Sequence, residues 1–139
     1  KKTFYKRKRN NRKTKKNITE RLRLAEKTEA MMSQAIDDLQ TSEKLPSDKH
    51  SLRTSFPSVR DCNGAIAAFG DASDFKRALA LFRQMRKAVT LLTSYNRNSN
   101  DMGRESMALP SPTLVTYSTL MSRAVGLGKE RVALRLWRL

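Results

Sequence analysis

Two segments of this 139-residue chain repeat one another at a fixed offset, and this repeat constrains the fold more than any other feature of the sequence. The first runs from Val59 to Gln84 and the second from Leu114 to Leu139, 55 residues further on. Identical residues stand at matching positions: Ala78, Leu79, Leu81 and Arg83 correspond to Ala133, Leu134, Leu136 and Arg138. Each copy has the length of two short helices with a tight turn. Because one such hairpin cannot bury its own apolar face, the copies are expected to stack side by side.

The amino-acid sequence of the second copy resembles a known repeat. It contains Pro112-Thr113-Leu114-Val115-Thr116-Tyr117-Ser118-Thr119-Leu120-Met121, then a turn with glycines, then Ala133-Leu134-Arg135-Leu136-Trp137. This resembles the consensus of the pentatricopeptide repeat (PPR) family. The first copy resembles it in its second half, from Arg77 to Met85, while Cys62 stands where an aromatic residue is usual. The resemblance covers somewhat under half of the chain.

The resemblance implies an all-α fold built as an αα-hairpin repeat solenoid. Repeat 1 is expected at 59–89, and repeat 2 at 114–139, truncated before its second helix is complete. Because the second repeat is truncated, the chain is expected to be a piece of a longer protein, or a processed one. Another αα repeat remains the alternative, although neither first helix has the Trp, Gly and Tyr pattern of tetratricopeptide repeats.

The net charge of +16 indicates a polyanionic partner. Residues 1–16 hold ten Lys or Arg and no acid, so we expect a disordered basic tail that contacts phosphates. The candidate phosphate contacts are Lys6, Arg7, Lys8, Arg9, Arg12 and Lys13. A solubilising arm or a residual targeting sequence is the alternative for this tail.

An amphipathic helix is predicted from about Ile18 to Ser42, within a segment 17–44. Asn17 and Glu20 have the spacing of a capping box at its start. Its apolar residues recur three, four or seven apart: Ile18, Leu22, Ala25, Met32, Ala35, Ile36 and Leu39. The helix is interpreted as a possible cap over the first repeat, with a coiled-coil partner helix as the alternative.

Two further segments separate these units. Residues 45–58 contain two prolines and the single histidine, His50, and are expected to form a linker. PPR units usually follow one another every 35 residues, so residues 90–113 are interpreted as an inserted loop and a lead-in to the second repeat. Asn96, Asn98, Ser99, Asn100 and Gly103 are typical of an exposed loop.

By the resemblance, the fifth and the last residues of a repeat select a base of single-stranded RNA. The fifth positions are Asn63, which implies a pyrimidine, and Ser118, which implies a purine. The last residue of repeat 1 becomes Thr113. The second positions, which pack between bases in the family, are Val115 and Arg60. The alternative for Asn63 and Ser118 is that they are polar helix residues that face solvent.

Catalysis is not expected. With one His and one Cys, the chain offers neither a metal-ligand cluster nor a Ser-His-Asp set. Gly126-Leu127-Gly128-Lys129 lacks the spacing of a phosphate-binding loop and falls where the hairpin turn belongs. No run of about 18 apolar residues occurs. We therefore expect no enzyme activity, no cofactor, no metal, no small-molecule substrate and no membrane insertion.

The leading functional hypothesis is an RNA-binding PPR protein in the RNA metabolism or translation of a mitochondrion or plastid, the organelles in which the family mostly works. The alternative is a structural subunit of a large organellar assembly such as a ribosome, with repeats on protein and the basic tail on ribosomal RNA. Other proteins of a larger ribonucleoprotein complex are expected partners in both cases. A protein-only scaffold is a third possibility.

Overall fold

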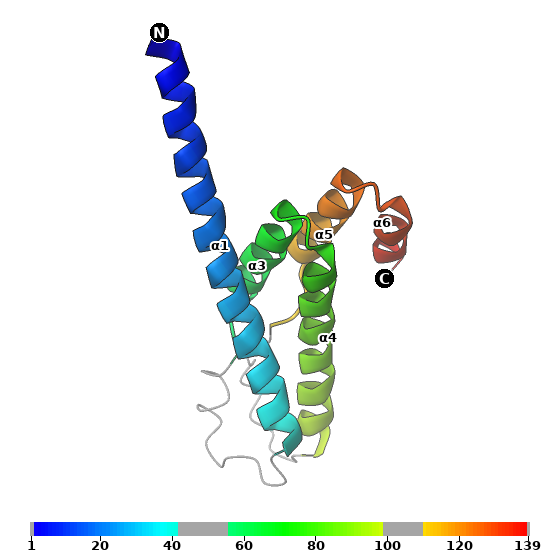
Figure 1. Ribbon diagram of the computed structural model, residues 1–139. Helices are drawn as coiled ribbons and strands as arrows, with labels where there is room; N and C mark the ends of the chain where they lie inside the picture. The colour runs from blue at the N-terminus through cyan, green and yellow to red at the C-terminus, as the bar shows by residue number, and fades with distance from the viewer. Residues whose placement is uncertain (1, 42–55, 99–109, 139) are drawn as a thin grey trace.

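The structure, a computed structural model, describes residues 2–41, 56–98 and 110–138 (Figure 1). Side chains are described from Asn17 to Thr41, from Phe56 to Ser94 and from Pro110 to Arg138. Within these ranges the chain forms five α-helices and no β-strand: α1 (Lys2–Thr41), α3 (Val59–Asp71), α4 (Phe75–Asn98), α5 (Leu114–Gly126) and α6 (Glu130–Trp137). The predicted all-α class is confirmed. None of the described helices is long and apolar enough to cross a membrane.

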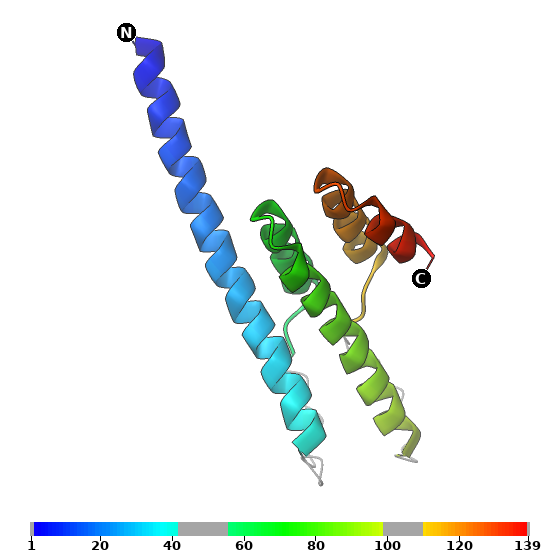
Figure 2. The same ribbon diagram turned by 45° about the vertical axis from the view of Figure 1, so that its right-hand side comes forward.

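The helices form two hairpins that lie side by side, flanked by α1 (Figures 1 and 2). Helices α3 and α4 make the first hairpin, and α5 and α6 make the second. Helix α3 packs between α1 and α5, while α1 and α5 also contact α4. Both hairpin turns lie at the same end, so α3 and α5 run in the same direction. Helix α1 therefore covers the side of the first hairpin away from the second, which is where a cap would lie.

The two hairpin turns have matching backbone hydrogen bonds at the offset of the sequence repeat. The amide of Asp74 donates to the carbonyl of Phe69 at 2.9 Å, and that of Lys129 to Ala124 at 2.7 Å. Ser73 and Gly128, 55 positions apart in the chain, both adopt left-handed conformations, with φ of 63° and 66°. Gly126–Lys129 is thus a hairpin turn, as predicted, and the sequence repeat is also a repeat of backbone structure.

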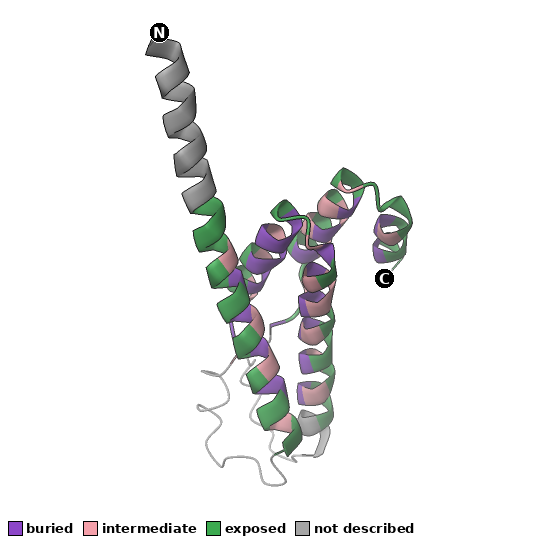
Figure 3. Cartoon of the chain, viewed as in Figure 1, coloured by how far each residue is buried: buried purple, intermediate pink, exposed green. Residues whose placement is uncertain are grey.

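The core lies where α1, α3 and α4 meet and continues to α5 (Figure 3). Apolar stripes on these helices supply it. Cys62, Ile66 and Phe69 of α3 are buried against Phe75, Phe82 and Met85 of α4, with Leu79 half-buried. Met32, Ala35 and Ile36 of α1 are buried as predicted, whereas Ile18 remains exposed.

Ion pairs join the helices across the core boundary. The Arg77 guanidinium of α4 lies 4.4 Å from the centre of the Phe69 ring and pairs with Glu26 and Glu29 of α1. Asp71, at the end of α3, pairs with Arg21 of α1 at 3.0 Å and with Arg123 of α5. One carboxylate thus ties α1 and α5 to α3.

The predicted start of the first helix was wrong. Helix α1 begins at Lys2, so Asn17 is an interior residue and not an N-cap, and residues 2–16 are helical where a disordered tail was expected. Lys and Arg are good helix formers, and no Gly or Pro interrupts the chain before Thr41. A capping sequence acts only where some other residue prevents the helix from continuing.

The predicted end of the first repeat was also wrong. Helix α4 continues past Val89 to Asn98, into the segment expected to be a loop. The hydroxyls of Thr93 and Ser94 donate to backbone carbonyls four residues earlier, and Leu92 is buried. Their polar side chains are thereby satisfied within the helix. The predicted linker up to residue 55 and the rest of the insertion, 99–109, lie outside the described residues.

The close approach of α5 to α3 yields a stability prediction at two glycines of α3. A Cβ on Gly70 would lie 2.6 Å from Cγ and 3.1 Å from Cβ of Arg123, while a Cβ on Gly64 would meet nothing within 4 Å. Gly70→Ala is expected to lower the free energy of unfolding by about 1–3 kcal/mol through overpacking. Gly64→Ala, its matched control, is expected to raise it by about 0.5–1 kcal/mol through helix propensity. Urea unfolding followed by circular dichroism measures both, and equal stability of the two variants would contradict the close packing.

Candidate nucleic-acid interface

Two of the side chains predicted to contact RNA, Asn63 and Thr113, lie at the contact between α3 and α5. This contact, called here the seam, is formed by Asn63, Gly70 and Asp71 with Thr113, Thr116 and Arg123. The seam has two ends because α3 and α5 run in the same direction. Arg123, Gly70 and Asp71 close the end next to the turns. Asn63, Thr113 and Thr116 form the other end, at the start of α5.

A buried hydroxyl connects the two predicted base-selecting residues of the first repeat. The Thr116 hydroxyl is fully buried and donates to Oδ1 of Asn63 at 2.6 Å. Its oxygen accepts the backbone N–H of Thr113 at 3.0 Å and lies 3.3 Å from the Thr113 hydroxyl. Asn63 and Thr113, which belong to different hairpins, therefore converge on one side chain.

This network fixes how Asn63 can act. Its Oδ1 is occupied by Thr116, and the side chain is half-buried. Its Nδ2 amide has no hydrogen-bond partner among the described residues, so two donor protons remain for a ligand. The Thr113 side chain beside it is exposed and offers a hydroxyl. The seam can thus present one donor amide and one hydroxyl to the edge of a flat, polar group.

Arg60 and Val115 occupy the first turns of α3 and α5, and both are exposed. A guanidinium plane and an apolar surface are both suited to pack on a nucleobase. The N-termini of α3 and α5, two helices that run in the same direction, add partial positive charge at this end.

Ser118 does not belong to this network. Its side chain is exposed, and its hydroxyl donates to the backbone carbonyl of Val115 at 3.1 Å. No described contact joins it to Asn63. The two fifth positions therefore have different surroundings: Asn63 is enclosed by the neighbouring hairpin, and Ser118 is open.

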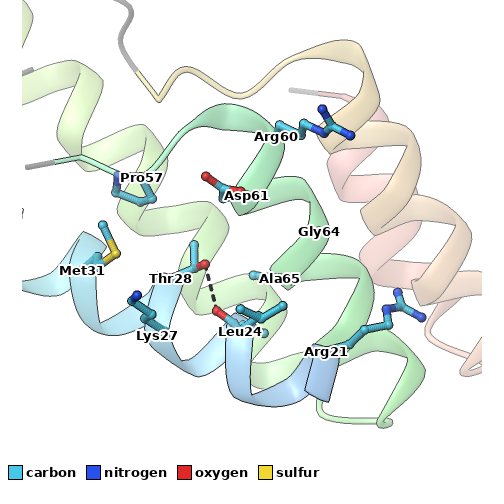
Figure 4. A pocket seen from close by; sticks show the side chains of 11 residues that line it. Arg21, Leu24, Lys27, Thr28, Met31, Pro57, Arg60, Asp61, Gly64 and Ala65 are labelled. Carbon is cyan, nitrogen blue, oxygen red and sulfur yellow. Dashed lines mark hydrogen bonds between the residues drawn. The ribbon is translucent and has the colours of Figure 1, made fainter. Parts of the chain in front are cut away.

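A groove lies between α1 and α3, and its lining includes Arg60 from the first turn of α3 (Figure 4). It has a volume of about 420 Å³ and is lined by Arg21, Leu24, Ala25, Lys27, Thr28, Met31, Pro57, Arg60, Asp61, Gly64 and Ala65. Three cations and a single acid, Asp61, surround an apolar floor. Asp61 accepts the Ser58 hydroxyl at 2.6 Å, and Arg21 already pairs with Asp71.

Sequence reasoning missed this groove. Leu24 and Met31 lie outside the predicted apolar stripe of α1 and remain 57% and 38% exposed. They are seven residues apart and so share one face of α1. The sequence signal that could have indicated the groove was this pair of apolar residues, seven positions apart and beside the main apolar stripe of α1.

The tail residues predicted to contact phosphates all lie within α1. These are Lys6, Arg7, Lys8, Arg9, Arg12 and Lys13, and their side chains lie outside the described part of the structure. The structure thus places the basic segment on a helix and leaves its phosphate contacts a prediction.

Comparison of the chain with protein-family models, with curated proteins and with solved structures found no match in any of the three. No residue thus receives a role from a relative. Among the described residues, no three His, Cys, Asp or Glu side chains come together in a way that could hold a metal ion. The assignment of function therefore depends on the seam, the groove and the charge of the chain.

Burial of Cys62 yields a prediction about its reactivity. Loss of hydration, with the nearby Asp61 carboxylate, raises the pKa of the Cys62 thiol to about 12. A thiol reagent at pH 8 is therefore expected to label the native chain far more slowly than the chain in urea, because the thiolate is the nucleophile. Labelling at equal rates would contradict this burial.

The same shift makes stability depend on pH. Above the unfolded pKa of about 8.5, the unfolded thiol loses its proton while the native thiol keeps it. The free energy of unfolding is then expected to fall by about 1.4 kcal/mol for each pH unit above that value. Cys62→Ala should lack this part of the pH dependence.

Proposed function

We propose that this chain is an RNA-binding protein of the pentatricopeptide repeat type, in which the two hairpins are successive turns of a solenoid. It binds single-stranded RNA along α3 and α5 and acts in the RNA metabolism or translation of a mitochondrion or plastid. The observation that carries the proposal is the convergence of Asn63 and Thr113 on Thr116. These are the two positions that the family resemblance assigns to the selection of one base.

The seam supports base selection by pre-organisation. Thr116 holds Oδ1 of Asn63, so the amide is oriented before any ligand arrives. The Nδ2 group then points a donor toward a base carbonyl, the group that both pyrimidines carry at O2. Val115 and Arg60 flank the base, and bases of single strands are commonly held by such stacking and edge contacts.

Affinity would come mainly from charge. A net charge of +16 and the cations of the groove favour the phosphate backbone. About 6–10 phosphate contacts would dominate binding by a chain this basic, and two hairpins select two bases at most. The seam therefore supplies preference, and the basic surface supplies most of the free energy of binding.

The long basic helix favours one alternative function. Residues 1–16 hold ten Lys or Arg, nine of which belong to α1, and this helix extends well past the hairpins (Figure 1). Such a helix suits a structural subunit of an organellar ribonucleoprotein such as a ribosome, with α1 on structured RNA and the hairpins on other proteins. In that case base preference would be absent while RNA binding persisted.

Base preference is tested at Asn63. Asn63→Asp keeps an oxygen for Thr116 and replaces the donor amide by an acceptor. The order of affinity for short single strands of U, C, A and G is therefore expected to change, by about 1–3 kcal/mol for the base that loses a hydrogen bond. Fluorescence anisotropy with the full chain at fixed salt measures it. Arg60→Gln is the control, expected to weaken binding to all four strands alike; an unchanged order in Asn63→Asp would refute selection by this residue.

The role of the basic helix is tested by salt. The logarithm of the affinity for single-stranded RNA is expected to fall with the logarithm of salt concentration at a slope of about −4 to −7. Replacing Lys6, Arg7, Lys8, Arg9, Arg12 and Lys13 by glutamine should reduce the magnitude of the slope by about 4. The order of base preference should stay the same in this variant. Loss of all RNA binding in this variant, together with no base preference in the unaltered chain, would favour the structural-subunit alternative.

A further inference from the structure

The second hairpin has an apolar outer face, which consists of Leu114, Val125, Leu134 and Trp137. These side chains are 85%, 58%, 59% and 75% exposed. The opposite face of α5, with Thr116, Leu120 and Ala124, is buried against the first hairpin. Four large apolar side chains on one side of a small hairpin form a surface that commonly marks an interaction site.

The corresponding side of the first hairpin is covered by the second. The equivalent residues of the first hairpin, 55 positions earlier, are all buried or half-buried: Val59, Gly70, Leu79 and Phe82. The Phe82 ring meets Tyr117 of α5 edge to face, with centroids 5.2 Å apart. Gly70 lies against Arg123, and Asn63, the equivalent of the open Ser118, is bonded to Thr116. Helix α5 thus occupies on the first hairpin the place that is open on the second.

We propose that the outer face docks a further helical hairpin, placed on α5–α6 as α5–α6 is placed on α3–α4. Such docking follows from the equivalence of the two hairpins and from the contacts between them. It is therefore independent of whether the chain binds RNA.

A second copy of this chain does not fit as the occupant. The occupant must present the kind of surface with which α5 meets α3, centred on Thr116, Tyr117 and Arg123. In each copy that surface of the second hairpin is already in contact with the first. On the first hairpin, the equivalent surface is covered by α1. Helix α1 therefore blocks head-to-tail association of copies and leaves the outer face to another hairpin.

Two differences between the hairpins specify the helix that docks. At two equivalent positions, the second hairpin has Val125 where the first has Gly70, and Gly126 where the first has Asp71. If the docking helix carried an arginine at the position of Arg123, that arginine would collide with the Val125 side chain. It would also lack the carboxylate that Arg123 binds on the first hairpin. The docking helix is therefore one with a short side chain at that position and an aromatic ring that reaches Trp137.

Trp137 is the single tryptophan of the chain and provides the test. The full chain is extended after Arg138 by a copy of residues 84–138, so that α6 continues as α4 does. In the appended copy Trp137 is replaced by Phe and Arg123 by Ala. Docking should take Trp137 from 75% exposure toward the 3% of its equivalent Phe82. Its emission should shift to the blue, and quenching by acrylamide should fall severalfold.

Control extensions define the interface. Restoring Arg123 in the appended copy should leave Trp137 more accessible, because the arginine meets Val125. Replacing the appended Tyr117 by Ser should do the same. An appended copy that stays unfolded, or that gains helix while Trp137 remains as accessible as in the 139-residue chain, would overturn the proposal. Shielding of Trp137 in the 139-residue chain with rising concentration would also overturn it, since that result would assign the face to a second copy.

Discussion

The arrangement of the two hairpins depends on one close approach, at the end of α3. Arg123 crosses Gly70 at a distance that leaves no room for a side chain, and it reaches Asp71. The same carboxylate holds Arg21 of α1. Because these pairs are partly exposed, their charges alone contribute modestly. Their larger effect is geometric, since a single residue fixes the positions of α1 and α5 on the two sides of α3.

The other end of the seam follows from that arrangement. Once α5 lies against α3, Thr116 is buried, and a buried hydroxyl must find partners. It finds them in Asn63 and Thr113, the residues that the proposed function needs at one place. Asn63 thereby has a double role, because one end of its amide stabilises the stacking of the hairpins and the other end stays available. A substitution of Asn63 that removes the whole amide would affect both roles at once. A substitution that keeps the oxygen preserves the bond to Thr116 and changes only the end that stays available.

The sequence predicted the helices and much of the core because both have local signals. The stripes of α3 and α4 and the turns near Ser73 and Gly128 follow from periodicity and from the repeat itself. The start of α1 was not predicted, because helix propensity outweighed the capping signal at Asn17. The end of α4 was not predicted either, because the loop-like residues after Val89 form helix, with hydroxyls bonded within it. The bond between Asn63 and Thr116 was also beyond prediction, since it joins residues 53 positions apart and depends on how closely the hairpins stack. The groove beside α1 required the packing of Leu24 and Met31 to be known.

Equivalent positions also explain why the two hairpins, so similar in backbone, differ in exposure. The first is covered on both sides, by α1 and by α5, whereas among the described helices the second packs only against the first. Leu79 and Leu134 are identical in sequence and differ only in their neighbours, one half-buried and the other 59% exposed. The residue types on the outer face therefore suit a covered surface, and Trp137 has no evident role in an open one. Since Ser118 lies on that same side, the hairpin that covers Trp137 would enclose Ser118 as α5 encloses Asn63. Completion of the apolar interface would then also complete a second base-selecting position.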